Sequence, residues 1–297
     1  MNFHSKKFLE INIATVMLGF NGIFAKAISL QPGVIIFLRS LIAFSVLFLF
    51  QKISEDKTSV QRNHHHMIIF LGGLLGIHWI TLFHSIQTST IAIGVISTFT
   101  FPIVTALLEP LIHKESWVRS DLMLAFLIML GVICITPEID FFSNTTQGVF
   151  WGLISSLAYS FRNIFSKKYV KQYGGIYVMR TQLIGVLVVS FPFISMWNFT
   201  ASHVDILNIF LMGVFTTAIA HTLFVKSLKY ISAKTASIIT SFQVVYSIVF
   251  ASFIFLEVPS WRELLGGAII LIAVLLESAK HSKKEEVLID GGGLIHL

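Results

Sequence analysis

Six polar or aromatic residues lie near the middle of long apolar segments of this chain. A helix rises about 1.5 Å per residue, so a residue about ten to twelve positions into such a segment lies near the midplane of a bilayer. Amide, hydroxyl and aromatic groups at that depth can bind a small polar molecule, and an imidazole with an ordinary pKa of about 6.5 can carry a proton. The sequence places no acidic residue at this depth, which argues against a carboxylate proton relay. The six residues are Asn21, His78, Trp79, Tyr159, Gln243 and Tyr246.

Three more polar residues lie in these segments but away from the midplane. Thr98 is shallower in its segment, as is its neighbour Thr100, and Asn163 lies nearer the cytoplasmic end of another. The two threonines would also be explained by hydrogen bonds to their own helix backbone. Asn21 and Gln243 have a structural alternative too, since an amide between helices stabilises their packing by about 1 kcal/mol.

The histidine and the tryptophan of the third segment have structural alternatives as well. His78 could be a buried neutral imidazole bonded to a neighbouring helix, and Trp79 could face lipid, although tryptophan prefers the interface. His84 and His221 lie toward the ends of their segments, where we expect ordinary structural roles.

Charged side chains inside the apolar segments form a third set of candidates. Arg39 and Arg180 are predicted to lie toward opposite faces, where each either reaches the interface or pairs inside the protein. The functional alternative is a symmetric pair of gate contacts, or attraction of a substrate carboxylate. Glu109, followed by Pro110, is either a proton-coupling carboxylate or an interfacial partner of a cation such as Lys114.

The remaining reactive residue types indicate neither a metal centre nor a catalytic site. His64, His65 and His66 are consecutive in a polar loop and rarely converge on one ion in that arrangement. The single cysteine, Cys134, lies in an apolar segment and is expected to be a small core residue. No segment holds a His-x-x-x-His pair, and no Walker-type loop is present. We therefore expect no metal, no cofactor and no enzymatic activity.

The composition is that of a membrane protein. Of the 297 residues 55% are hydrophobic and 12% are charged, and the mean hydropathy is +0.82. Soluble domains carry about 25% charged residues. The formal charge of +6 could suggest nucleic-acid binding, but the basic residues sit in short loops, where membrane orientation explains them better. We expect a lipid bilayer as partner, and no nucleic acid.

The apolar residues fall into ten segments, most of them about 18–22 residues long, the length that crosses a bilayer core. The predicted spans are 9–27, 32–50, 67–86, 91–112, 121–136, 148–166, 176–197, 205–225, 233–256 and 261–279. Alternate loops and both ends of the chain hold sixteen lysines and arginines, and the loops between them hold none. Positive residues stay on the cytoplasmic side, so both termini are predicted to be cytoplasmic.

The chain also repeats itself. Ile23–Lys26, followed by Arg39, returns 141 positions later as Ile164–Lys167, followed by Arg180. A shift that spans five crossings turns the second copy upside down relative to the first, and inverted halves are typical of transporters. The fold class predicted is an all-α polytopic membrane protein with ten transmembrane helices as two inverted five-helix repeats. Residues 1–140 and 141–280 form the repeats, and 281–297 a flexible cytoplasmic tail.

Ten spans in two five-span repeats resemble the bacterial EamA-type branch of the drug/metabolite transporter superfamily. The resemblance covers residues 9–279 and includes an arginine in the second helix of each repeat and a glutamate that closes the fourth, Glu115 and Glu257. Tryptophan follows each glutamate. The proline that the family often has in the fourth helix is present as Pro102, but Gln243 stands at the matching position in the second repeat.

The resemblance implies a secondary carrier in the bacterial inner membrane that exports amino acids or other small metabolites by alternating access. Spans 1, 3, 4, 6, 8 and 9 would surround its central cavity, and coupling to protons is left open. Glycines at Gly72, Gly73, Gly76, Gly266 and Gly267 permit close helix approach, including a homodimer contact. The competing classes are an intramembrane enzyme and a non-transporting receptor or assembly subunit.

Overall fold

The computed structural model describes residues 3–53, 62–114, 116, 119–136, 140, 142–196, 201–221, 223 and 233–291. Glu115 and Trp117 of the first glutamate–tryptophan motif lie outside these residues. Within them the chain forms helices and no strand. In chain order the elements are α1 (Phe3–Ala27), α2 (Pro32–Ile53), α3 (Arg62–Thr88), α4 (Ile91–Thr98), α5 (Phe101–His113), α6 (Arg119–Ile135), α7 (Asn144–Tyr173), α8 (Gly175–Ser190), the 3₁₀ helix η1 (Phe191–Met196), α9 (His203–Leu211), the π-helix η2 (Met212–Ile219), α11 (Ala233–Ile254) and α12 (Trp261–Gly291).

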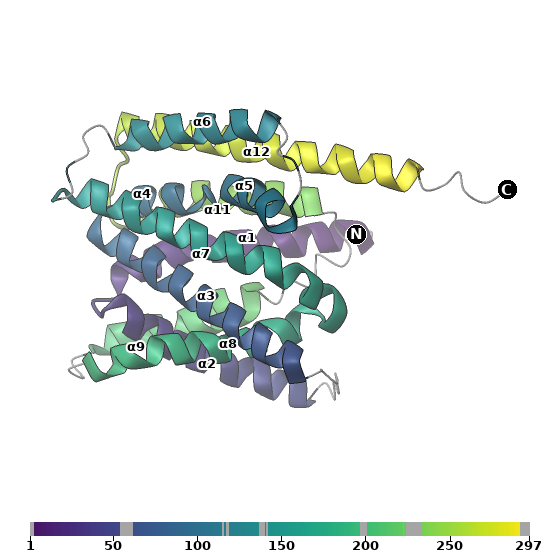
Figure 1. The fold of residues 1–297 in the computed structure, drawn as a ribbon. Coiled ribbons are helices and arrows are strands. Elements are labelled where there is room, and N and C mark those ends of the chain that lie inside the picture. Colours follow the sequence, from purple (N-terminus) through teal and green to yellow (C-terminus); the bar gives the residue numbers. More distant parts are fainter. Residues whose placement is uncertain are drawn as a thin grey trace.

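The helices run side by side in stacked layers (Figure 1). α6 and α12 form the layer at the top of the view, α2, α8 and α9 lie at the bottom, and α3 crosses between them. The first residues of α1 and the last of α12 lie on the same side of the bundle.

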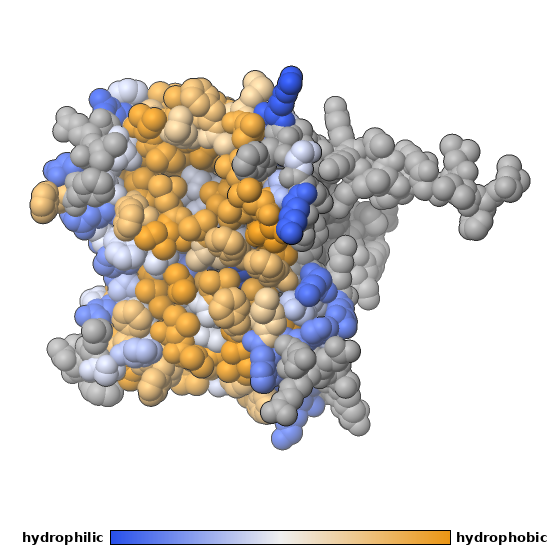
Figure 2. Space-filling model, in the orientation of Figure 1, coloured by the Kyte–Doolittle hydropathy of each residue, from blue (hydrophilic) through white to orange (hydrophobic). Residues whose placement is uncertain are grey.

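A belt of apolar side chains crosses the face of the bundle that Figure 2 shows. In Figure 2 the hydrophobic residues fill the middle of the visible face, and the hydrophilic ones gather at the two ends of the helices. Large apolar side chains point outward here, among them Met123 and Phe126 of α6, which are 72% and 56% exposed. Water would penalise such a surface, whereas hydrocarbon does not. Within the described ranges, four segments are long and apolar enough to cross a membrane, namely Pro32–Lys52, His64–Thr88, Ile91–Ile112 and Gly175–Ser195.

The fourth predicted span is broken into two helices. α4 ends at Thr98, and α5 begins at Phe101 with Pro102 in its first turn. Proline lacks the N–H that would continue the helix ladder, and it disfavours helical geometry in the residue before it. The corresponding ninth span has Gln243 instead, and α11 runs unbroken through it. The mismatch between the two halves therefore has a direct structural consequence.

Three other parts of the chain differ from the prediction: the start of the third span, the helix type in the eighth span and the C-terminal tail. α3 begins at Arg62, so His64, His65 and His66 lie in a helix and not in a loop. The eighth span continues from α9 into the π-helix η2, where the hydroxyls of Thr216 and Thr217 both donate to the carbonyl of Met212. α12 continues to Gly291, so 281–291 is helical where a flexible tail was predicted. This stretch is rich in lysine and glutamate, which favour helix.

Glycines bring helices of the two halves of the chain into direct backbone contact. A Cβ on Gly72 of α3 would clash with the carbonyl of Gln182 in α8, and one on Gly185 with the carbonyl of Ile69. Gly213 of η2, 141 positions after Gly72, packs on α2 in a similar way, with its Cβ position 3.0 Å from the carbonyl oxygen of Arg39. The largest interfaces, α3 with α7 and α8, α6 with α12, and α1 with α11, all join one half to the other.

Candidate substrate-binding site

Two aromatic rings from different halves stack in the centre of the bundle. The imidazole of His78 on α3 lies 4.3 Å from the ring of Tyr159 on α7, with 21° between their planes. Phe101, at the start of α5, meets the ring of Tyr159 edge-on at 4.8 Å. The break before α5 puts Phe101 at this point. His78 is 6% exposed, and its ring is enclosed.

The hydrogen bonds of His78 define its tautomer. Nδ1 lies 3.1 Å from the carbonyl oxygen and 2.8 Å from the hydroxyl oxygen of Ser155 on α7. The contact with a carbonyl, which only accepts, favours the tautomer with the proton on Nδ1. The Ser155 hydroxyl in turn donates to the carbonyl of His78 at 2.9 Å. In the neutral ring the lone pair is therefore on Nε2. The structural alternative predicted for His78 from the sequence was a hydrogen bond to a neighbouring helix, and this bond is present. It leaves Nε2 as the basic nitrogen of the ring.

Arg39 of α2 is buried and has no counter-ion among the described residues. Its side chain is 1% exposed, and its guanidinium carbon lies 4.3 Å from the Trp79 ring centre and 5.5 Å from that of Phe83. Nη1 has a weak contact of 3.7 Å with the sulfur of Met212, and Nε and Nη2 have no hydrogen-bond partner among the described residues. The arginine was expected either to reach the membrane interface or to pair inside the protein. Its side chain does not extend to the interface, and it forms no ion pair among the described residues. Trp79 is 5% exposed and does not face lipid.

Arg162 of α7 is a second interior cation, and it was not among the predicted site residues. Its Nε donates to Oε1 of Gln182 on α8 at 3.0 Å, Nη2 donates to the same oxygen, and Nη1 donates to Oδ1 of Asn163 at 2.9 Å. Gln182 donates onward to Ser166 at 2.9 Å. These partners are all uncharged. The repeat offered a signal for this residue, because Arg162 lies 141 positions after Asn21.

His221, which directly follows the residue after η2, joins these groups into one cluster. Its ring lies 6.0 Å from that of Trp79. Arg39 and Arg162 are each close enough to both His78 and His221 to act on them electrostatically. We call Arg39, His78, Trp79, Tyr159, Arg162 and His221 the central cluster. The ordinary structural role expected for His221 stays a prediction.

Three other residues named from the sequence form hydrogen bonds to helices that also carry or adjoin members of the central cluster. Asn21 of α1 accepts from the hydroxyl of Thr216 in η2 at 2.8 Å. Thr100 bonds its own chain at Ser97 but also donates to Ser156 of α7 at 2.8 Å, and Thr98 contacts the carbonyl of Gly152 at 3.5 Å. The own-backbone alternative thus holds in part for Thr100 and not for Thr98.

The remaining residues named from the sequence are not members of the central cluster. Tyr246 of α11 stacks on Phe250 at 6.3 Å, and Gln243 is half-buried on the same helix. The guanidinium carbon of Arg180 lies 5.3 Å from the ring centre of Tyr177. In the part of the chain that the structure describes, no hydrogen bond or ring contact joins these three to the central cluster. Glu109 is half-buried on α5.

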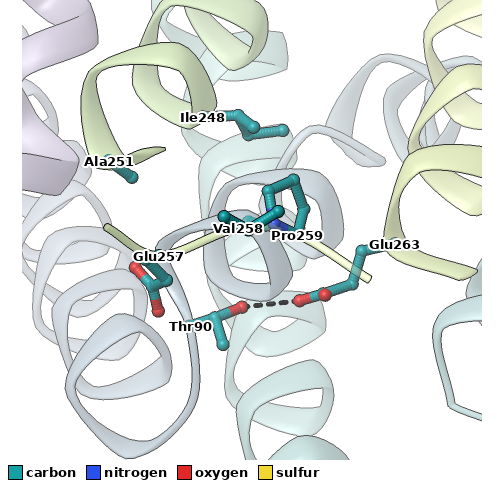
Figure 3. Close-up of a pocket in the computed structure, with 8 residues that line it drawn as sticks. Thr90, Ile248, Ala251, Glu257, Val258, Pro259 and Glu263 are labelled. Atoms are coloured by element: carbon teal, nitrogen blue, oxygen red, sulfur yellow. Dashed lines mark hydrogen bonds between the residues drawn. The ribbon is translucent and has the colours of Figure 1, made fainter. Parts of the chain in front are cut away.

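Polar contacts close the end of the bundle where α1 ends and α4 begins. Lys26 donates to the carbonyl of Ser89 at 2.8 Å and lies 3.9 Å from Glu257, and the Thr90 hydroxyl donates to Glu263 at 2.8 Å. Figure 3 shows Thr90 and Glu263 facing each other across a small pocket with Glu257 at its side. The pocket holds about 210 Å³ of empty space, part of it open to solvent.

Two more side chains fasten this end. The amide nitrogen of Gln87 lies within 3.2 Å of three carbonyl oxygens at the end of α1 and in the turn after it, those of Ala25, Ile28 and Leu30. Asp205 of α9 accepts from both the backbone N–H and the hydroxyl of Ser29 at 2.9 Å. Access to the central cluster from this end would require these contacts to separate.

The consecutive histidines near the start of α3 contact tyrosines and not each other. Nδ1 of His64 lies 2.7 Å from the hydroxyl of Tyr173, and Nδ1 of His65 lies 3.1 Å from that of Tyr177. These contacts fasten α3 to the turn between α7 and α8. Among the described residues no group of three histidine, cysteine or carboxylate side chains has the arrangement of a metal site.

The helices, the apolar belt and the enclosed polar cluster define a polytopic all-α membrane protein. The model of the EamA-like transporter family matches residues 8–136 and again residues 146–278. The chain therefore belongs to the EamA-like transporter family.

Individual relatives are similar over nearly the whole chain. The uncharacterized transporters YdfC and YxxF of Bacillus subtilis are each 24% identical to it. YdfC aligns over 96% of both chains, and YxxF over 95% of this chain and 93% of its own. An uncharacterized transporter of Archaeoglobus fulgidus is 23% identical over 65% of this chain and 68% of its own. A solved crystal structure has a TM-score of 0.65 with 13% identity, over 95% of this chain and 99% of that one, a likeness of fold alone.

Proposed function

We propose that the protein is a secondary transporter that moves small metabolites across the membrane by alternating access. The observation that carries this proposal is the central cluster, which is polar and built from both halves of the chain, with Arg39, His78 and Trp79 buried and its other members half-buried. Arg39, His78 and Trp79 come from the first half, and Tyr159, Arg162 and His221 from the second. Burial of a charged group in the middle of an apolar bundle costs free energy, and such groups inside membrane-spanning segments mark functional sites by default. A solute reaches this cluster only when one end of the bundle opens.

The proposal includes ten spans arranged as two inverted five-helix repeats, at 1–140 and 141–280. The shift of 141 residues supports it, as does the way in which helices of one half pack on those of the other. We further propose that both termini face the cytoplasm of a bacterial cell, on the basis of the loop charges. Amino acids or related compounds are the proposed cargo, and export the proposed direction.

Counterflow in proteoliposomes tests the transporter proposal. Vesicles that contain the purified protein and a high internal concentration of an unlabelled solute are expected to accumulate the labelled form from outside. The panel contains amino acids, organic acids, nucleosides and organic cations, and protein-free vesicles are the control. Absence of exchange across the whole panel would contradict the carrier proposal.

We propose that His78 couples transport to protons through Nε2. His78→Ala is expected to abolish the accumulation that a pH gradient drives, while counterflow, which needs no gradient, persists at a reduced rate. His84→Ala is the matched control, because His84 lies on the same helix and contacts Trp151 edge-on at 5.0 Å. Uptake driven by a pH gradient is measured for both variants between about pH 5.5 and 8, a range that brackets the ordinary imidazole pKa. An unchanged pH dependence in His78→Ala would exclude this role.

A further inference from the structure

We propose that the central cluster recognises the carboxylate of its cargo and that Arg39 is the residue that binds it. The inference rests on the proposed transport function and adds the chemical class of the substrate. It assigns the two unpartnered nitrogens of Arg39 to the two carboxylate oxygens.

The geometry of the guanidinium supports this assignment. Nε and Nη2 of Arg39 are the nitrogens without a hydrogen-bond partner, whereas Nη1 is directed at the sulfur of Met212. In an arginine the N–H of Nε and one N–H of Nη2 point in the same direction and form a fork. This fork matches the spacing of two carboxylate oxygens and gives a bidentate, charge-assisted pair. The edge of Arg39 that has no hydrogen-bond partner is therefore the edge whose geometry a carboxylate fits.

Nothing in the described part of the chain neutralises this cation. Arg39 forms no ion pair there, and its contacts with Trp79 and Phe83 are cation–π interactions. Such contacts replace only part of the hydration that a buried guanidinium loses. A bound anion would satisfy both the charge and the two open N–H groups.

Arg162 adds a second positive charge without competing for the same ligand. Its own fork is occupied by the amide oxygen of Gln182, a neutral acceptor that leaves the charge of Arg162 in place. Two cations with uncharged partners create a positive potential in a medium of low dielectric constant, which attracts anions and repels amines. The cluster thus selects against organic cations.

The aromatic side chains define what else the ligand carries. The Trp79 ring lies directly beside the guanidinium of Arg39, and His78 and Tyr159 form a stacked pair in the same cluster. Among the described residues of the cluster, no carboxylate is present that would pair with an ammonium. The ligand class is therefore a small carboxylate with an apolar or aromatic body, and a free amino group is not required for binding.

The test uses four probes that share one aromatic body, namely 3-phenylpropanoate, phenylalanine, phenylalaninamide and phenethylamine. Binding to the purified full-length protein in detergent is followed by tryptophan fluorescence, and Trp79→Phe identifies the signal that arises beside Arg39. The two carboxylates are expected to bind and the amide and amine not to bind. Arg39→Gln is expected to weaken carboxylate binding by about 10- to 100-fold. Arg39→Lys keeps the charge but not the fork and is expected to be intermediate.

Arg262→Gln is the matched control, because Arg262 is exposed at the start of α12 beside Trp261 and should bind the carboxylates as the wild type does. Equal binding of phenylalaninamide and phenylalanine, or full carboxylate binding by Arg39→Gln, would overturn the inference. Counterflow of neutral or cationic solutes by a protein that binds no carboxylate would overturn it while leaving the transporter proposal intact. Carboxylate binding without counterflow of any solute would reject the transporter proposal alone.

Discussion

Arg39→Met is expected to raise the stability of the ligand-free protein while transport is lost. Burial of an unpaired guanidinium costs several kcal/mol, and the cation–π contacts with Trp79 and Phe83 return about 2 kcal/mol. Methionine fills a comparable space without charge. We expect the free energy of unfolding to rise by about 1–3 kcal/mol. A gain in stability together with a loss of transport is the result expected of a residue that binds the substrate but destabilises the ligand-free fold.

Thermal unfolding of the detergent-purified variant and counterflow of a labelled carboxylate in proteoliposomes provide the two measurements. Arg180→Met is the comparison, because Arg180 is the equivalent residue 141 positions later but is only half-buried and lies beside Tyr177. It should gain less stability. A fall in the unfolding temperature of Arg39→Met would mean that Arg39 stabilises the helix packing and would remove the reason to assign it to a ligand.

Gly185→Ala is expected to prevent the bundle from assembling. A Cβ at Gly185 would collide with the carbonyl of Ile69 and the N–H of Gly73, which belong to the backbone of α3 and cannot rotate away. The helices would have to separate along their whole crossing. We expect a loss of more than about 3 kcal/mol, which exceeds the usual effect of a point substitution.

Gly73→Ala is the matched control on the facing helix, because its Cβ would meet only the side-chain tip of Val189 at 3.3 Å. The amount of monodisperse protein after detergent extraction and its unfolding temperature are the measurements. Gly73→Ala should remain close to the wild type. Equal behaviour of the two variants would show that α3 and α8 are not held at the distance seen here.

Depth along a helix could be predicted from the sequence, whereas the face that a side chain occupies could not. Counting from the segment ends named His78 and Tyr159, whose rings stack, and Trp79, which lies beside Arg39. The same count passed over Arg162 and set His221 aside, since both lie toward the ends of their segments. They reach the cluster because α7 and η2 turn those side chains inward, which depends on packing between helices.

Of two departures from regular α-helix, the break between α4 and α5 and the π-helix η2, only the first has a signal in the residue types of the sequence. Pro102 gives a specific reason for the break between α4 and α5, and its absence at Gln243 fits the continuous α11. The π-helix at Met212–Ile219 has no comparable signal in the residue types. It coincides with the close approach of Gly213 to α2 and with the bond from Thr216 to Asn21, two contacts between distant parts of the chain.

The backbone contact between α3 and α8 bears on which parts of the molecule can move as rigid bodies. Two helices that touch through glycines have no side-chain layer that could slide or repack, so they travel together. One of them belongs to residues 1–140 and the other to residues 141–280. In the proposed transport cycle, a unit that contains both helices would not coincide with either of the two proposed repeats. The boundary between moving parts would then cut across both repeats.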